Sequence, residues 1–212
     1  MQKEKKWEME KSGYLELFLG PMFSSKTSHL IMIATEESDT GSKVLYINHS
    51  GDIRETKGGE LGKFTSHSSS LNSMSKDIAT VCTKVLGDVR VDEYDVIAVD
   101  EGNFYRDIFT TVVDWVNRLK KTVYIAALDG DSNMGLFGDV YKLYPFADKY
   151  TKLNGKCLAC RDEHLKSGCS GQTPKIPAPF SKRIVNDTNQ ELVGGVDKFV
   201  AVCRYHHSTH NY

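Results

Sequence analysis

Short hydrophobic runs alternate along the chain with longer segments in which apolar residues recur at helical spacing. The runs have the continuous, β-branched character of parallel strands that are covered on both faces. Strands that alternate with helices in this way predict an α/β fold with a doubly wound parallel sheet. The predicted strands are 14–19, 43–47, 95–99 and 122–128, and the predicted helices are 29–37 and 104–119.

The segment between the second and third strands is less regular. Residues 50–62 are rich in glycine and charge, which indicates a mobile surface loop, and 64–67 has the character of a short strand. Residues 75–86 have apolar side chains at helical spacing, so we expect a helix there with Cys82 as a small core residue. The apolar positions of this predicted helix are Ile78, Val81, Cys82 and Val85.

The first predicted strand leads into a short loop and then a helix, which is the context of a phosphate-binding loop. Backbone N–H groups and the helix dipole would hold phosphate, Lys26 would add a positive charge, and Thr27 would ligate Mg²⁺. Ser25 stands where this motif has glycine. Its backbone therefore either adopts the positive φ that glycine allows, at an energetic cost, or lies in the usual φ region. The competing interpretation is a strand-turn-helix capped by a serine. The loop is Gly20-Pro21-Met22-Phe23-Ser24-Ser25-Lys26-Thr27.

The third strand ends in two acids, Asp100 and Glu101. Because ligands of open α/β sheets bind outside the carboxyl ends of the strands, Asp100 is a candidate for orienting Mg²⁺. The competing interpretation is an acidic helix N-terminus. Taken together with the phosphate loop upstream, the two acids favour the metal interpretation.

Two pairs of soft ligands follow in the C-terminal part, Cys157 with Cys160 and Cys203 with His206. Such close pairs predict a tetrahedral structural zinc site, although a redox Cys-x-x-Cys is a rival for the first pair. His207 and His210 are alternatives for the fourth ligand, and Cys169 is expected to be free. We therefore expect a flexible arm at 1–12, a phosphate-loop α/β nucleotide-binding domain at 13–150 and a small zinc-binding domain at 151–212.

Composition narrows the class of protein. The chain has 212 residues, enough for one domain with a small appendage, and its formal net charge of -1 argues against a nucleic-acid-binding surface. Five unevenly spaced cysteines do not suit a disulfide framework. The charged N-terminal residues do not resemble a signal peptide, and no run approaches the ~18 apolar residues of a membrane span. We expect a soluble protein of a reducing, cytoplasmic compartment.

These features together resemble the thymidine kinases of the cellular and poxviral type, over nearly the whole chain. The motifs that carry the resemblance include 20–24, 52–54, 65–67, 100–104, 127–130, 137–138, 157–160, 181–183, 194–199 and 202–204. The resemblance implies ATP-dependent phosphorylation of the thymidine 5′-hydroxyl to thymidine monophosphate, for nucleotide salvage, by a homotetramer or homodimer.

The resemblance also implies residue roles. Glu101 would be the general base, and Phe104 would stack near the base of the nucleoside. Arg54 would lie near the phosphates, together with the phosphate loop at 20–27. Arg183 would lie near the base of the lasso, the segment between the two Cys/His pairs that would close over the nucleoside. The remaining substrate-binding positions implied are Met22, Leu128, Phe137, Gln190, Leu192 and Phe199.

The chain departs from the family pattern at Ser25, Ser132, Met134 and Phe199. These departures leave open a deoxynucleoside kinase with altered base preference. They also leave open a nucleotide-binding protein without catalysis, although that would not require Lys26, Thr27, Asp100 and Glu101 together.

Overall fold

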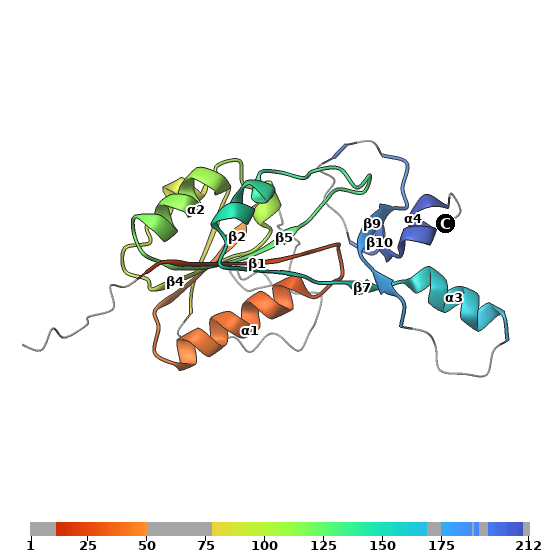
Figure 1. The fold of residues 1–212 in the computed structure, drawn as a ribbon, viewed down its shortest axis with the longest axis horizontal. Helices are drawn as coiled ribbons and strands as arrows, with labels where there is room; N and C mark the ends of the chain where they lie inside the picture. Colours follow the sequence, from red (N-terminus) through yellow and green to blue (C-terminus); the bar gives the residue numbers. More distant parts are fainter. Residues whose placement is uncertain (1–11, 51–77, 169–174, 188, 191–194, 210–212) are drawn as a thin grey trace, which may run out of the picture.

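The structure, a computed structural model, describes residues 12–50, 78–168, 175–187, 189–190 and 195–209. A six-stranded, fully parallel sheet forms its centre, with the order β3-β2-β4-β5-β1-β6. The expected α/β fold with a parallel sheet is therefore confirmed (Figure 1). Its strands are β1 (Tyr14–Gly20), β2 (Val44–His49), β3 (Ala79–Thr83), β4 (Val96–Val99), β5 (Thr122–Leu128) and β6 (Lys149–Lys152).

Helices cover both faces of the sheet, because side chains on successive strand residues point to opposite sides. One face packs against α1 (Lys26–Asp39), and the other against α2 (Ile108–Asn117) (Figure 1). Alternating residues of β1 show the division: Leu17 joins the cluster that includes α2, and Phe18 joins the cluster that includes α1. Short 3₁₀ helices, η2 (Leu86–Asp88) and η4 (Val140–Phe146), extend the α2 side, and η3 (Gly102–Phe104) follows β4.

The helix predicted for residues 75–86 is wrong, because the described part of this segment contains strand β3 at the edge of the sheet. Ala79, Val81 and Thr83 are half-buried, whereas Thr80 and Cys82 are exposed. The period is therefore 2, and Cys82 is not a core residue. The loop predicted at 50–62, apart from residue 50, and the strand predicted at 64–67 lie outside the described residues.

The register brings the carboxyl ends of the central strands to one edge of the sheet. Gly20 is opposite Leu128, and Val99, the residue before Asp100, is opposite Ile125. Gly20 has a φ of 153°, and a Cβ there would lie 2.4 Å from the carbonyl oxygen of Leu153. Glycine is therefore needed where the chain leaves β1 beside the segment that follows β6.

The C-terminal part lies beyond one end of the sheet (Figure 1). Its buried apolar cluster is small, consisting of Cys157, Ala178, Ala201 and Val202 with partly buried neighbours. The domain boundary expected at residue 150 falls inside β6, which pairs with β1. The elements of this part are β7 (Gly155–Lys156), α3 (Leu158–Lys166), β8 (Pro177–Ala178), β9 (Phe180–Arg183), β10 (Phe199–Val202) and α4 (Arg204–Ser208).

Among the helices of the described residues, none is both long and apolar enough to cross a membrane.

Candidate functional site

The loop between β1 and α1 has a strained backbone. Ser25 has φ 65° and ψ 25°, so it occupies the left-handed region that favours glycine, and Phe23 has φ 61°. The Ser25 side chain makes no capping hydrogen bond, and the Ser24 hydroxyl donates to the carbonyl oxygen of Pro21 at 2.8 Å. Of the two conformations expected for Ser25, its backbone therefore adopts the one typical of glycine, which is strained for a residue with a side chain.

Lys26 begins α1, and its Nζ donates to the carbonyl oxygen of Pro21 at 2.7 Å. Burial lowers the pKa of this ammonium group, whereas the carboxylates of Glu101, Asp100 and Asp129 oppose the shift. The lysine therefore lies among the acids that follow β4 and β5. Its charge is available beside the loop, where phosphate oxygens would bind.

Asp100 is buried and accepts three hydrogen bonds. The Thr27 hydroxyl and the Glu101 amide donate to Oδ1 at 3.2 and 2.9 Å, and the Tyr46 hydroxyl donates to Oδ2 at 3.0 Å. Burial raises the pKa of Asp100, and these hydrogen bonds, together with Lys26, oppose that rise. The Thr27 hydroxyl and the Asp100 carboxylate are hard oxygen donors that suit Mg²⁺.

Glu101 has φ 54°, an uncommon conformation for a residue with a side chain. It is the N-cap residue of η3, whose last residue is Phe104. Strained residues of this kind are frequent at functional sites, where the surrounding structure holds them in place. The strain at Glu101 and the proximity of Lys26 are consistent with a catalytic position.

Two of the predicted nucleoside-binding aromatic residues meet beside η3. The rings of Phe104 and Phe137 make an edge contact with centroids 5.4 Å apart, and His49 stacks on Phe104 at 5.4 Å. Leu128 is linked to this group through Asn103, whose Oδ1 accepts a hydrogen bond from the Leu128 amide at 3.0 Å. The family resemblance gave Phe104, Phe137 and Leu128 roles in substrate binding. In the fold Phe104 contacts Phe137, and Leu128 is hydrogen-bonded to the residue before Phe104.

A second group involves the predicted lasso residues. The Gln190 side chain donates to Asp131 Oδ2 at 2.7 Å and to the carbonyl oxygen of Leu136 at 3.0 Å. Burial would raise the pKa of Asp131, but hydrogen bonds from Gln190 and from backbone amides outweigh it and lower the pKa. Arg183 donates to the carbonyl oxygens of Asp187 and Asn189, and its guanidinium lies 5.6 Å from the ring centroid of Phe199.

The phosphate loop is in direct contact with the C-terminal part. The Met22 amide donates to Ser181 Oγ at 2.9 Å, and Ser181 is buried in β9. At another contact, Phe23 of the same loop packs against the small apolar cluster that includes Cys157 and Ala201. The β9–β10 pair is therefore attached directly to the loop that would hold phosphate.

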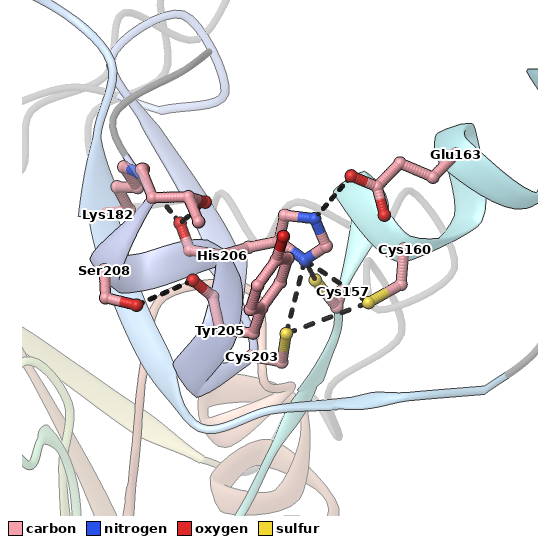
Figure 2. Close-up of polar contacts among 9 residues, drawn as sticks. Cys157, Cys160, Glu163, Lys182, Cys203, Tyr205, His206 and Ser208 are labelled. Atoms are coloured by element: carbon pink, nitrogen blue, oxygen red, sulfur yellow. Dashed lines mark hydrogen bonds and ion pairs between the residues drawn. The ribbon is translucent and has the colours of Figure 1, made fainter.

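The four predicted zinc ligands converge from two helices, α3 and α4, and from the cysteines that cap their N-termini. Figure 2 shows the sulfur atoms of three cysteines gathered around the imidazole of His206. His206 Nδ1 lies 3.6, 3.4 and 3.3 Å from the Sγ atoms of Cys157, Cys160 and Cys203, and the last two sulfurs are 3.7 Å apart. All four ligand atoms lie within 4.8 Å of one another.

These separations fit zinc. A tetrahedron with Zn–S bonds of about 2.3 Å has S···S edges of roughly 3.8 Å, and its S···N edges are slightly shorter. The donor set of three thiols and one imidazole is also the chemistry that zinc prefers. His207 donates through Nε2 to the carbonyl oxygen of Ser132 at 3.0 Å, so it is engaged elsewhere. His206 is the fourth member of the cluster.

Glu163 adds an outer partner to the cluster, because its Oε1 lies 2.9 Å from His206 Nε2 (Figure 2). This hydrogen bond, with smaller contributions from Cys203 and Cys157, raises the pKa of His206 to about 9 although burial opposes the shift. A carboxylate on the second ring nitrogen orients a histidine so that the first nitrogen faces the metal.

Some predicted residues cannot be placed. Arg54, Leu192, Cys169 and His210 lie outside the described residues. In turn, the fold reveals three polar residues near the sites that sequence reasoning gave no role: Tyr46, Ser181 and Glu163. Ser181 occurs in a family-like motif, but nothing in the pattern around Tyr46 or Glu163 pointed to its partner.

The fold and the site define a phosphate-loop α/β protein with an appended Cys/His cluster of zinc-binding type. A family model described as thymidine kinase matches residues 13–207. A thymidine kinase of sheeppox virus (strain KS-1) is 32% identical over 194 residues, covering 91% of this chain and 95% of the relative. Thymidine kinase 1 of Dictyostelium discoideum is 34% identical over 195 residues, covering 91% of this chain and 77% of the relative.

A more distant relative, a thymidine kinase of rice (Oryza sativa subsp. japonica), is 29% identical over 195 residues, covering 92% of this chain and 66% of its own length. The chain belongs to the thymidine kinase family. It is thus a nucleoside kinase, as the sequence analysis expected.

Proposed function

We propose that this protein transfers the γ-phosphoryl group of ATP to the 5′-hydroxyl of thymidine, giving thymidine monophosphate for nucleotide salvage. The observation that carries the proposal is the grouping of Lys26, Thr27, Asp100 and Glu101 at the carboxyl edge of the sheet. Family membership supports a nucleoside as the acceptor. A nucleotide-binding protein without catalysis would not require all four residues.

The proposed chemistry rests on positioning and charge neutralisation, as in other phosphoryl transfers. The loop amides and Lys26 hold the phosphates of ATP, with Arg54 as a further predicted contact. Thr27 and Asp100 would hold Mg²⁺, which would supply positive charge for the phosphate oxygens. Glu101 accepts the proton of the 5′-hydroxyl as general base.

The nucleoside is proposed to lie against Phe104 and Phe137, with Met22, Leu128, Arg183, Gln190, Leu192 and Phe199 as further substrate-binding residues. The contacts of Gln190 with Asp131 and Leu136 support a position of the lasso beside the Phe137 loop. Zn²⁺ is proposed to be structural, because Cys157, Cys160, Cys203 and His206 provide four protein ligands. A homotetramer or homodimer and a cytoplasmic location are carried over from the family resemblance as proposals.

The test is an assay of the purified full chain with ATP, Mg²⁺ and a panel of deoxynucleosides, read as monophosphate formation. We expect thymidine to have the highest kcat/KM. Preferential phosphorylation of another deoxynucleoside would instead support altered base preference. If no nucleoside is phosphorylated while ATP still binds, the proposed activity is wrong.

A further inference from the structure

Tyr46 belongs to β2, yet its hydroxyl meets the acid at the end of β4. Its side chain is 1% exposed, and its hydroxyl donates to Asp100 Oδ2 at 3.0 Å. The Thr27 hydroxyl and the Glu101 amide both donate to the other oxygen, Oδ1. The two carboxylate oxygens of Asp100 are therefore held from different elements.

Strand pairing explains how Tyr46 reaches this position. Tyr46 is opposite Ala98 in the β2–β4 register, and both residues belong to the apolar cluster on the α1 face. Asp100 comes two residues after Ala98, and its amide donates to the Ile47 carbonyl oxygen at 2.9 Å. A tyrosine is long enough to reach a diagonal neighbour on the same face of a sheet, and the residue directly opposite Tyr46, Ala98, has a small side chain.

We propose that Tyr46 is a positioning residue for Asp100, which it holds in the orientation that serves Mg²⁺-nucleotide binding. This inference rests on the proposed function for the role of Asp100. The Tyr46 hydroxyl restrains Oδ2, and this keeps Oδ1 directed at Thr27. The partners of metal-binding side chains commonly set metal affinity or activity by about 10- to 100-fold.

The test is Tyr46→Phe in the full chain, which removes the hydroxyl and keeps the ring. The first measurement is calorimetric binding of a non-hydrolysable ATP analogue over a range of free Mg²⁺. The second is turnover with thymidine over the same range. Without Mg²⁺, the affinity for the analogue should stay within about twofold of wild type. The Mg²⁺ midpoint, which is the Mg²⁺ concentration that gives half of the maximal effect, should rise about 10-fold or more in both measurements. High Mg²⁺ should restore part of the lost kcat.

Tyr124→Phe is the matched control. Tyr124 is also a buried tyrosine whose hydroxyl donates to a carboxylate, Glu37 Oε1 at 2.7 Å, but this acid is near the end of α1 farthest from the loop. We expect Tyr124→Phe to leave the Mg²⁺ midpoint unchanged.

The inference is overturned if Tyr46→Phe keeps the wild-type Mg²⁺ midpoint, even with reduced activity, because Tyr46 would then be a core residue alone. An equal shift in Tyr124→Phe would overturn it as well. The binding measurement needs no turnover, so it decides the role of Tyr46 even if the wild type phosphorylates no nucleoside, which would be a failure of the proposed function.

Discussion

The phosphate-loop region and the Cys/His region of this protein are stabilised in different ways. Around Asp100, the polar side chains project from β2, β4 and α1, which pack in two large apolar clusters. Around His206, the apolar cluster has four buried residues, and the side chains that converge are the four candidate metal ligands. The first site is therefore supported by the large core around the sheet, whereas the second joins segments that share only a small apolar cluster.

This difference predicts how each region responds to damage. The sheet buries enough apolar surface to keep its fold when a polar side chain is changed. In small metal-binding units, by contrast, the free energy of metal binding is in effect folding free energy. Perturbing one region should therefore leave the other largely intact.

The largest effect is expected from removing zinc. Structural zinc contributes on the order of 10 kcal/mol in small units, so chelation should unfold the C-terminal part. Cys157→Ser should act in the same direction. Nucleoside affinity should fall more than ATP affinity, because the phosphate loop belongs to the sheet. Metal analysis and separate titrations with thymidine and an ATP analogue measure this.

Cys82→Ser is the control for that experiment, because Cys82 is exposed on β3 and is not part of the cluster. It should retain one zinc per chain and both affinities. A Cys157→Ser protein that loses ATP binding first would contradict the separation of the two regions.

Glu101→Gln should lower kcat by roughly 10²- to 10⁴-fold, the usual contribution of a general base. The zinc content and ATP affinity should stay the same, because the change lies at the edge of the sheet. Steady-state kinetics and calorimetry test this, with the exposed Glu93→Gln as control. Near-normal turnover of Glu101→Gln would show that another group accepts the proton.

Ser181→Ala tests the connection between the regions. It removes the oxygen that accepts the Met22 amide, and an unsatisfied buried donor costs about 1–3 kcal/mol. We expect faster zinc release to a chelator and weaker ATP binding together, because one contact supports both regions. The exposed Ser208→Ala on α4 is the control, and a change in only one of the two readouts would argue against the connection.

The smallest effect is expected for Ser25→Gly. Since Ser25 has a φ of 65°, glycine relieves strain, but it also adds freedom to the unfolded chain. We expect a gain of about 0.5–1 kcal/mol in the free energy of unfolding. Ser24→Gly should have the opposite sign, because it loses the hydrogen bond to Pro21. Denaturant unfolding of both variants measures the difference, and a loss of stability in Ser25→Gly would assign its side chain a role.

Much of the fold follows from local pattern. Strand β5 has the bounds predicted from its apolar run, and α1 follows the loop as the motif requires. These predictions succeed because buried parallel strands leave a continuous hydrophobic signal. The prediction of a helix at 75–86 failed because β3 is an edge strand, which buries fewer apolar residues than a central strand. The apolar residues in this segment recur at a spacing that also fits a helix.

The sequence by itself determined which side chains are candidate metal ligands. The spacing of two Cys/His pairs predicts a zinc site, and two acids after a strand predict a metal site at the carboxyl edge of the sheet. Only the tertiary structure decided which histidine joins the cysteines, that Ser25 takes a glycine-like φ, and that Tyr46 meets Asp100. Spacing along the chain reports which groups are neighbours in sequence. Contacts between strands depend on sheet order and register, which arise from packing of the whole domain.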